Sequence, residues 1–448
     1  MKKILLFITT ILMLPLMTSS LYAVDFASSY GVSPKGISLG NAMCARVNDW
    51  SSAYYNMAGL GKSYGDADHH SQIGFAYLKN SPDFNIDINR TKSSDGTALS
   101  TNGDQDLETG TFVVGLAVDI QKIIIDLPFV STLRFGVVAG VNDDMTAVKI
   151  NDLDPRTHNY MKYGRESQKL TIMNGFGAGF MDDSFGIGIG LNSTFGGDGV
   201  VLLENVQLLD GPQSPVANSK MDMKIEQTLI AGLYYSPGRM HDVLEGLEFG
   251  LTYKEESELN IQPFQTAAET DLGGIPLNLG LALHDFYQPP SVTFGVAYMI
   301  SKFQVSFDVE YQMWSKFSPS TTVMSNYSSE IKELDDILIP RLGLEVMLPE
   351  GFALQSGYYF EPSFVPDDAV AGRINFLDND KHVGSVGVSY KLPDEFMNIK
   401  GQLELNAGCQ VQYMDERDVK KTTPTPENPD YSFGGACYSF IFGGSLSL

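Results

Sequence analysis

The sequence predicts an all-β fold, a 14-stranded antiparallel transmembrane β-barrel with an N-terminal hatch (plug) inside its lumen. Three observations carry this prediction. Many short segments alternate apolar and polar residues with a period of two, these segments number fourteen, and a block without that alternation precedes them. The composition agrees, because 44 glycines among 448 residues weaken helices and 11% aromatic residues argue against a disordered chain.

The alternation is clearest in residues 247–254, where the odd positions are apolar and the even ones are polar or small. The same pattern recurs in residues 303–311, 342–346 and 403–407. Charged residues recur on the polar face and are nearly absent from the apolar face, which favours a lipid-facing barrel over a water-soluble sandwich. The chain also ends in a strand, residues 438–448, whose aromatic and aliphatic face runs to the last residue.

The predicted strands follow one another along most of the chain. They begin near residues 72, 112, 133, 170, 184, 224, 246, 289, 303, 338, 352, 382, 400 and 434. Two further candidates, near Val200 and Glu258, are interpreted as strand extensions or loop structure. Short turns such as residues 181–183 and 301–302 alternate with long polar connections, which is the asymmetry expected between the two ends of an outer-membrane barrel.

The first residues have the pattern of a secretory signal peptide. Lys2 and Lys3 precede an apolar stretch, residues 4–17, and a candidate cleavage site at Ala23. An uncleaved membrane anchor is the alternative, although the stretch is short for a span. No later segment reaches the ~18 apolar residues of a membrane helix, so we expect the mature chain to be soluble or to cross a membrane as a closed barrel. The predicted domains are a signal peptide (1–23), a hatch (24–68) and a transmembrane β-barrel (69–448).

Charge and cysteine content argue against two other classes of protein, nucleic-acid-binding proteins and disulfide-stabilised domains. A net charge of -24 makes a nucleic-acid partner improbable, and three cysteines cannot form a disulfide framework. Cys409 and Cys437 lie symmetrically about the connection between the last two strands, but strand parity puts Cys409 on the lipid face and Cys437 toward the lumen. Since residues on opposite faces cannot pair, we expect three free thiols, including Cys44 of the hatch.

Catalysis is the rival class. An outer-membrane lipase or acyltransferase needs a nucleophile and a base, but the six histidines lie in no nucleophile motif and no Gly-x-Ser-x-Gly elbow occurs. We therefore expect no enzyme activity, no cofactor and no metal. The acidic groups Asp104, Asp106, Glu108, Asp378 and Asp380 lack the spacing of a calcium loop and are interpreted as solvated.

Residues 28–62 contain a Gly-Asn-Ala step, an Asp before a Ser/Ala pair, and an Asn-x-Ala-Gly sequence. The residues that carry this motif are Gly40, Asn41, Ala42, Asp49, Asn56, Ala58 and Gly59. The pattern resembles the N-terminal plug of the outer-membrane long-chain fatty acid and hydrophobic compound transporter family (FadL/TodX type), with Met57 where a proline is usual. Weaker matches in the family's order extend the resemblance over essentially the mature chain, at residues 290–292, 311–317, 340–343, 364–367 and 378–382.

The resemblance implies a monomeric barrel in the outer membrane of a Gram-negative bacterium, in contact with outer-membrane lipids. It also implies passive uptake of hydrophobic small molecules, either fatty acids or hydrocarbons. In that family the ligand is thought to leave sideways through a kink in the third strand. The corresponding lateral gate residues here are Gly136, Gly140 and Asn142, although a plain strand end explains the same residues.

A physical argument supports a plug independently. Eight strands make a barrel that side chains fill, and sixteen leave an aqueous channel, so a fourteen-stranded bore would leak unless it were plugged. A hydrophobic solute also needs an apolar pocket rather than a water-filled pore. A general diffusion porin, a structural outer-membrane protein and a lipid-modifying enzyme remain as alternative functions.

Six glycines point inward from the two strands that cover residues 170–191. They are Gly175, Gly177, Gly179, Gly186, Gly188 and Gly190. Such a surface lets another backbone approach, so we assign it as the wall against which the hatch docks. A locally thin wall beside an open pathway is the alternative.

Inward-facing cations are the candidate partners of a fatty-acid carboxylate. By parity these are Arg134, Lys254 and Arg341. The alternative is that they pair with acids in the lumen, as hatch cations would. Aromatic residues are the candidate lining of the ligand pocket, or else they only pack the hatch against the wall; they are Trp50, Tyr54, Tyr55 and Trp314.

Overall fold

The structure is a computed structural model. It describes residues 26–63, 71–88, 107–121, 127, 129–142, 158–160, 162–163, 170–204, 216–268, 277–317, 334–372, 375–392, 401–425 and 428–448. The predicted signal peptide and the acids at residues 104 and 106 lie outside these ranges.

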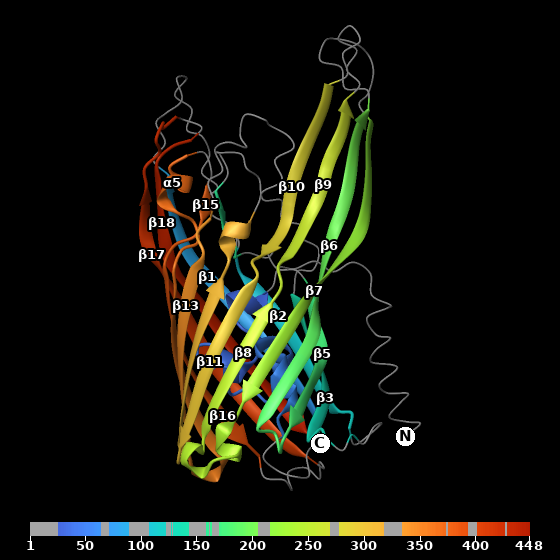
Figure 1. The fold of residues 1–448 in the computed structure, drawn as a ribbon. Helices are drawn as coiled ribbons and strands as arrows, with labels where there is room; N and C mark the ends of the chain where they lie inside the picture. Colours follow the sequence, from blue (N-terminus) through green and yellow to red (C-terminus); the bar gives the residue numbers. More distant parts are fainter. Residues whose placement is uncertain are drawn as a thin grey trace.

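Fourteen strands close into one antiparallel barrel, in which β1 pairs with β18 to complete the ring (Figure 1). The strands are β1 (Gln72–Ile88), β2 (Thr109–Asp119), β3 (Thr132–Asn142), β5 (Thr171–Phe180), β6 (Phe185–Glu204), β7 (Val216–Tyr235), β8 (Leu247–Lys254), β11 (Ser291–Ile300), β12 (Phe303–Gln312), β13 (Ile337–Met347), β14 (Phe352–Glu361), β16 (Lys381–Lys391), β17 (Gln402–Val419) and β18 (Tyr431–Ser447). Each predicted strand start lies in or beside one of them. The predicted fold class and strand number are therefore confirmed.

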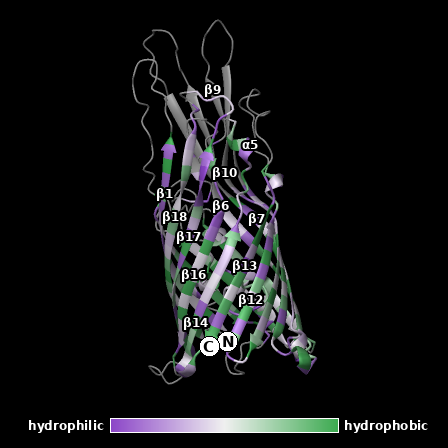
Figure 2. Ribbon diagram, turned by 90° about the vertical axis from the view of Figure 1, so that its left-hand side faces the viewer, coloured by the Kyte–Doolittle hydropathy of each residue, from purple (hydrophilic) through white to green (hydrophobic). Residues whose placement is uncertain are grey.

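Hydrophobic and hydrophilic residues alternate along the strands (Figure 2). Large apolar side chains stand on the outside, such as Ile189 at 60% exposure and Phe440 at 62%. Their neighbours in sequence point inward and are buried, as Arg134 and Tyr359 are. The period of two thus assigns the faces correctly, because a closed barrel gives every strand one lipid side and one luminal side.

One end of the barrel carries short connections. The turn between β5 and β6 uses three residues with positive φ, Met181, Asp182 and Asp183, and Ser301 has φ 55° between β11 and β12. Short 3₁₀ helices complete two other turns at this end: η4 (Pro237–Arg239) with η5 (Asp242–Leu244), and η7 (Pro349–Gly351). We call this the short-turn end.

The opposite end carries the long connections, and β6, β7, β9 (Ser257–Ala268) and β10 (Leu277–Gln288) extend well above the other strands there (Figure 1). Val200 lies in the extension of β6, and Glu258 lies in β9, which pairs only with β10. Both candidates are therefore what the sequence predicted, an extension and loop structure. The remaining elements at this end are β4 (Asn159–Tyr160), β15 (Phe376–Leu377), η6 (Trp314–Lys316) and α5 (Asp367–Val370).

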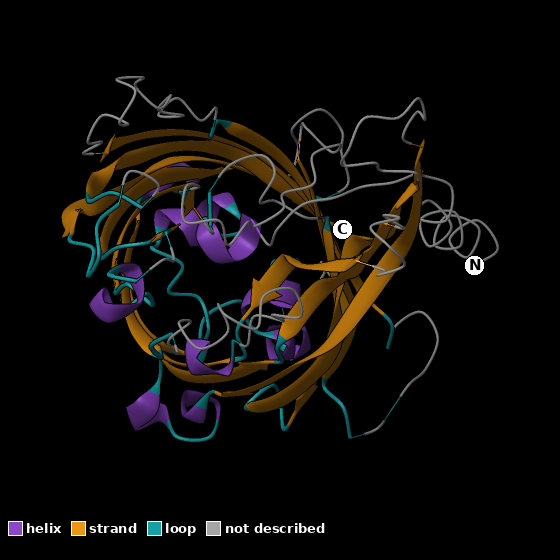
Figure 3. Ribbon diagram, turned by 90° about the horizontal axis from the view of Figure 1, so that it is seen from above, coloured by secondary structure: helices purple, strands orange, loops and turns teal. Residues whose placement is uncertain are grey.

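Residues 26–63, which we call the hatch segment, lie inside the ring of strands (Figure 3). The hatch segment consists of short helices and turns: α2 (Phe26–Ser29), α3 (Pro34–Ser38), α4 (Ser52–Tyr55) and η2 (Met57–Gly61). Most of its residues are buried. Among the described residues, no helix is both long and apolar enough to cross a membrane.

Glycines on the inner wall let the hatch segment approach the strands closely. A Cβ atom at Gly177 would lie 2.6 Å from the carbonyl oxygen of Met57, and one at Gly188 would overlap the backbone of Met57 and Ala58. Five of the six predicted glycines therefore lie against the hatch segment, in agreement with the assignment of this wall, whereas Gly186 faces Tyr234 of β7. Twelve of the fourteen strands offer such a glycine to the hatch segment: Gly74, Gly115, Gly136, Gly177, Gly188, Gly232, Gly250, Gly295, Gly343, Gly357, Gly387 and Gly408. We call this ring the glycine belt.

The cysteines lie where parity places them. Cys437 is fully buried and faces the lumen, whereas Cys409 follows the outward residues Ala407 and Leu405 on β17. Cys409 lies opposite Phe440 and Cys437 lies opposite Gln412, so the two cysteines are also not register partners. All three thiols are unpaired in the structure.

The glycine belt generates a first prediction. Gly177→Leu or Gly188→Leu should displace the hatch, because the added side chain overlaps hatch backbone and overpacking of this kind costs about 1–3 kcal/mol or more. Conductance to small ions in a planar bilayer should rise for both variants. Gly384→Leu is the matched control, since a Cβ at Gly384 meets nothing within 4 Å, and it should conduct like the wild type. Unchanged conductance in the first two variants would contradict the docking assignment.

Thiol counting tests the strand faces. Denatured, unreduced protein should show three free thiols, and a lipid-soluble maleimide should modify Cys409 first in the folded state. Burial raises the pKa of the Cys44 thiol well above its ordinary value, so this thiol stays protonated and should react slowly. A single free thiol would mean that a disulfide exists and that the face of one of the last two strands is misassigned.

Candidate ligand site in the barrel lumen

The hatch motif residues shape the hatch segment and fasten it to the wall. Asn56 caps η2, since its Oδ1 accepts a hydrogen bond from the Ala58 amide at 3.1 Å. Its Nδ2 donates to the carbonyl of Cys44 at 2.8 Å and to that of Leu233 on β7 at 3.0 Å. Met57 is fully buried in this turn and fills the glycine notch of β5 and β6.

The Gly-Asn-Ala step makes a left-handed turn against the opposite wall. Gly40 (φ 61°) and Asn41 (φ 59°) both have positive φ, and a Cβ at Gly40 would lie 2.8 Å from the amide nitrogen of Tyr358 on β14. The Asn41 Oδ1 accepts a hydrogen bond from the Tyr55 hydroxyl at 2.7 Å. Burial raises the pKa of that hydroxyl, so it remains a donor.

The remaining motif residues also act within the hatch. Asp49 Oδ1 accepts hydrogen bonds from the amide and the hydroxyl of Ser51, at 2.8 and 2.5 Å. Gly59 has no room for a side chain, because its Cβ position is taken by Val47 and Ser52. Ala42 and Ala58 are completely buried. The motif residues therefore stabilise the fold of the hatch segment and its contacts with the wall. The contacts described for them are with other hatch residues and with the wall strands.

Barrel acids hold the hatch cations. Glu345 on β13 accepts from Lys35 at 2.9 Å and from Arg46, and its own Oε1 also accepts from Gln355 at 3.1 Å. Lys62 pairs with Glu248 on β8 at 2.9 Å. The structure therefore shows hatch cations paired with luminal acids, as the alternative interpretation in the sequence analysis states.

Arg134 belongs to this fastening rather than to an open pocket. Its side chain is 1% exposed, and Nε donates to the carbonyl of Leu60 at 2.7 Å while Nη1 donates to that of Asn48 at 3.3 Å. A guanidinium that bridges two hatch carbonyls fixes the end of the hatch against β3.

Lys254 lies where the wall and the hatch meet. Its ammonium group is 3.4 Å from the centroid of the Tyr54 ring, a close cation–π contact, and Tyr54 itself packs edge-to-face on Tyr55 at 4.9 Å. Tyr54 donates its hydroxyl hydrogen to the carbonyl of Ala27 at 2.8 Å. Lys254 and these two hatch tyrosines, predicted separately, therefore form one cluster.

Arg341 pairs with an acid. Its Nη2 lies 2.6 Å from Glu310 Oε2 on β12, and its guanidinium carbon lies 4.5 Å from the centroid of the Tyr359 ring. Lys254 also lies close enough to Glu310 for its positive charge to stabilise the ionised form of that carboxylate. The pair and Lys254 together form a small charged cluster on the inner wall.

A second ionic cluster continues this charged line toward the long-connection end. Lys381 bridges Glu361 and Asp378 at 2.9 Å each, and Lys162 also pairs with Glu361. Lys381 and Glu361 are almost fully buried. The interpretation of Asp378 as a solvated acid is therefore wrong, because this side chain is 2% exposed and paired. The cluster itself was not predicted, although Glu361 and Lys381 are register partners at the ends of β14 and β16, and opposite charges at such ends are a usable signal.

Trp314 lies away from the hatch, in the cap at the long-connection end. It stacks on Phe364 with ring centroids 3.8 Å apart and donates from Nε1 to Gln312 at 2.9 Å. Lys162 lies 5.2 Å from its ring. The structure therefore does not bring Trp314 together with the hatch aromatics.

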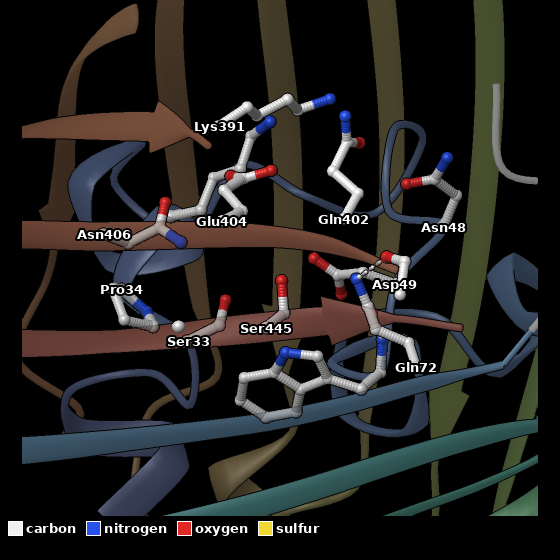
Figure 4. A pocket seen from close by; sticks show the side chains of 14 residues that line it. Ser33, Pro34, Asn48, Asp49, Gln72, Lys391, Gln402, Glu404, Asn406 and Ser445 are labelled. Carbon is white, nitrogen blue, oxygen red and sulfur yellow. Dashed lines mark hydrogen bonds between the residues drawn. The ribbon is translucent and has the colours of Figure 1, made fainter. Parts of the chain in front are cut away.

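Trp50 lies between the hatch and the wall, toward the short-turn end. Its indole fills the notches of Gly74 on β1 and Gly115 on β2, and its amide donates to Gln72 at 2.9 Å. A polar cavity lies beside it (Figure 4). Trp50 is thus separate from the cluster around Lys254.

Two of the predicted gate residues, Gly136 and Gly140, are paired on both sides in β3, whereas Asn142 is paired on one side only. Pairing with β2 runs to Asn142 and pairing with β5 runs to Gly140. Hatch side chains fill the glycine notches from inside, Leu60 at Gly136 and Phe26 at Gly140. The residues just after Asn142 lie outside the described ranges.

The outer side of the docking wall is hollowed. An apolar concavity of about 590 Å³ spans β3 to β8 on the lipid side, bordered by Phe176, Ile187 and Leu251. Behind it lie Gly188 and Gly232, which touch the hatch. The wall is therefore thin here, but hatch backbone closes it from inside.

The described residues contain no group of three or more His, Cys, Asp or Glu side chains placed to hold a metal ion. Across the described ranges, the luminal chemistry consists of ion pairs, aromatic rings and glycine contacts, an arrangement that can bind a molecule with an apolar body.

The fold and the lumen define a class, a fourteen-stranded barrel of the outer-membrane type filled by its own N-terminal segment. The chain has the fold of solved FadL-type proteins, among them a FadL homologue and the hydrocarbon channel CymD, so the resemblance predicted from the sequence is confirmed at the level of the fold.

The comparisons extend over nearly the whole chain. A FadL homologue from Pseudomonas aeruginosa superposes with a TM-score of 0.54 at 13% identity, covering 96% of this chain and 99% of that one. The monoaromatic hydrocarbon channel CymD gives 0.53 at 14% identity, covering 95% and 99%. Alkane uptake protein A of Marinobacter nauticus is 23% identical over 442 residues, 95% of this chain and 91% of that protein. No protein-family model matches the chain.

The buried Glu345 cluster generates a prediction about stability. Glu345→Gln leaves Lys35 and Arg46 without their counter-charge, and breaking a buried pair costs about 3–5 kcal/mol. Urea unfolding in lipid vesicles should show that loss. The matched control is Glu108→Gln, which breaks the exposed Lys79–Glu108 pair (2.8 Å) and should cost less than about 1 kcal/mol. Equal losses for the two variants would mean that Glu345 does not fasten the hatch.

Proposed function

We propose that this protein provides a passive path for hydrophobic small molecules, fatty acids or hydrocarbons, across the outer membrane of a Gram-negative bacterium. The barrel carries an apolar outer face suited to outer-membrane lipids, and its bore is filled by the hatch segment. The similar proteins named above are an alkane uptake protein and a hydrocarbon channel. In this proposal residues 1–23 are a signal peptide, 24–68 the hatch and 69–448 the barrel, and the protein acts as a monomer. The short-turn end then faces the periplasm.

The cluster of Lys254, Tyr54 and Tyr55 is the observation that carries the substrate class. A cation beside aromatic rings, on an inner wall, suits a molecule with an apolar body and an anionic end. We assign Lys254 as the principal partner of a carboxylate, because its ammonium group lies 3.4 Å from the centroid of the Tyr54 ring and so places a cation directly beside an aromatic surface. Arg341, which pairs with Glu310 at 2.6 Å, is its neighbour on the inner wall.

Release of the ligand sideways through the wall is part of the proposal. Gly136, Gly140 and Asn142 of β3 are the proposed gate, and Leu60 and Phe26 of the hatch would have to leave the glycine notches for it to open. A hydrocarbon has no polar group whose hydration would be lost in lipid, so the route needs no polar side chains.

Uptake by cells is the direct test. Cells that express the protein should accumulate labelled hexadecane and labelled palmitate faster than cells with an empty vector. Liposomes with the purified protein should not swell with small sugars. Swelling with sugars and no hydrocarbon uptake would instead indicate a general diffusion porin.

The charge of Lys254 yields a specific prediction. Lys254→Met keeps an apolar stem but removes a charge-assisted contact of about 1.5–3 kcal/mol, so palmitate binding should weaken about tenfold or more. Hexadecane binding should be unchanged, and the Lys254→Arg variant should retain palmitate binding. Titration of detergent-solubilised protein with each ligand measures this. Equal loss for both ligands would point to structural damage and contradict the assignment.

A further inference from the structure

Glu310 of β12 is the acid of the charged cluster on the inner wall. Its Oε2 lies 2.6 Å from Nη2 of Arg341 on the neighbouring strand β13. Its Oε1 accepts a hydrogen bond from Nε2 of Gln312 at 3.0 Å. Lys254 of β8 acts on the same carboxylate through its positive charge. Two cations and one amide donor therefore serve a single carboxylate of the protein.

Trp314 fixes the amide that holds Glu310. Gln312 is 7% exposed, and its Oε1 accepts a hydrogen bond from the indole nitrogen of Trp314 at 2.9 Å. Since the amide oxygen receives the indole hydrogen, the amide nitrogen is left to donate to Glu310. Trp314 is itself restrained by its stack on Phe364, with ring centroids 3.8 Å apart. Trp314 thus lies two hydrogen bonds away from the charged cluster.

Aromatic rings lie beside the same two cations. The guanidinium carbon of Arg341 is 4.5 Å from the centroid of the Tyr359 ring, and the ammonium group of Lys254 is 3.4 Å from that of Tyr54. An apolar surface next to a cation suits a molecule with an apolar body and a carboxylate end. In this structure the carboxylate that these cations share is the side chain of Glu310.

A ligand carboxylate and Glu310 compete for these cations. A carboxylate that approaches Lys254 or Arg341 also approaches the negative charge of Glu310, and the repulsion offsets part of the attraction. An uncharged chain in the same pocket experiences neither the attraction nor the repulsion. The strength with which Glu310 is held in place therefore affects anionic ligands and leaves uncharged ones unaffected.

We propose that Glu310 is a specificity-determining residue, an internal competitor that lowers the affinity of the lumen for carboxylates and shifts its preference toward uncharged hydrocarbons. Gln312 and Trp314 are positioning residues that hold Glu310 beside Arg341. The inference rests on the proposed function and refines its substrate class. Lys254 attracts an anionic end, and Glu310 limits that attraction.

Removal of the Glu310 charge tests the competition. Glu310→Gln should bind palmitate about tenfold more tightly, because Arg341 becomes available to the ligand. Binding of hexadecane, which has the same chain length, should be unchanged. Glu404→Gln is the matched control, since it removes another acid of the inner face, in the cavity beside β18, and both affinities should stay at the wild-type value. Titration of detergent-solubilised protein with each ligand measures these affinities.

Removal of the whole ion pair identifies the cation that is released. The double variant Glu310→Gln with Arg341→Met leaves no unpaired charge from this pair, so folding should be retained. Its palmitate affinity should return to about the wild-type value, because the released guanidinium is absent. Arg341→Met alone should weaken palmitate binding, because Glu310 then repels the ligand without the compensating charge of its partner.

The positioning residues are tested with both charges in place. Trp314→Phe keeps an aromatic ring but removes the indole N–H, and Gln312→Met removes the amide from a side chain of similar length. Palmitate binding should tighten about threefold in each variant, because a carboxylate with one hydrogen bond fewer yields more easily to the ligand. Hexadecane binding should stay constant, whereas a merely structural role would change both affinities.

Unchanged or weaker palmitate binding in folded Glu310→Gln protein would overturn the proposal. An equal change in hexadecane affinity would do the same, as would a gain in the double variant as large as that in Glu310→Gln. If Glu310→Gln does not fold, the two positioning variants decide, and unchanged palmitate binding in both rejects the proposal. Wild-type protein that neither binds nor takes up either ligand would reject the proposed function, and this inference with it.

Discussion

The close approach of hatch backbone to wall glycines is the contact on which the rest of the structure depends. At Gly177, Gly188 and Gly250 a single methyl group would overlap hatch atoms, so the wall can be this close only where side chains are absent. A fourteen-stranded bore is too wide for wall side chains alone to fill. The glycine belt lets the hatch lie directly against the wall. Because little space then remains between the two, the short helices of the hatch are enough to fill the bore.

Electrostatics complements this packing. The hatch carries cations where the wall carries acids, as at Lys35 and Arg46 with Glu345 and at Lys62 with Glu248. Pairs that are shielded from water are costly to break, so they set the orientation of the hatch rather than merely adding stability. Farther along the lumen, Arg341 pairs with Glu310 of the wall itself, and Lys254 contacts an aromatic residue of the hatch. Fastening of the hatch and the proposed recognition of a ligand thus use the same chemistry at different levels of the lumen.

The candidate site was predictable in part. Alternation alone placed Arg134, Lys254 and Arg341 on the inner face, and all three are there. Alternation did not reveal that Arg134 bridges hatch carbonyls or that Arg341 pairs with Glu310. It shows on which face of the sheet a side chain lies, but neither its level along the barrel axis nor its partner. Trp314 illustrates the same limit, since its stacking partner Phe364 belongs to a different connection.

The sequence by itself determined the number of strands, their faces and the inward glycines, because these follow from local alternation and turn residues. It also determined the hatch turns at Gly40 and Asn56, whose conformations depend on nearby residues. Only the tertiary structure decided which wall sector receives each part of the hatch and that β18 receives none through a glycine. Those contacts join residues hundreds of positions apart, and their positions depend on the register and closure of the whole barrel rather than on any segment.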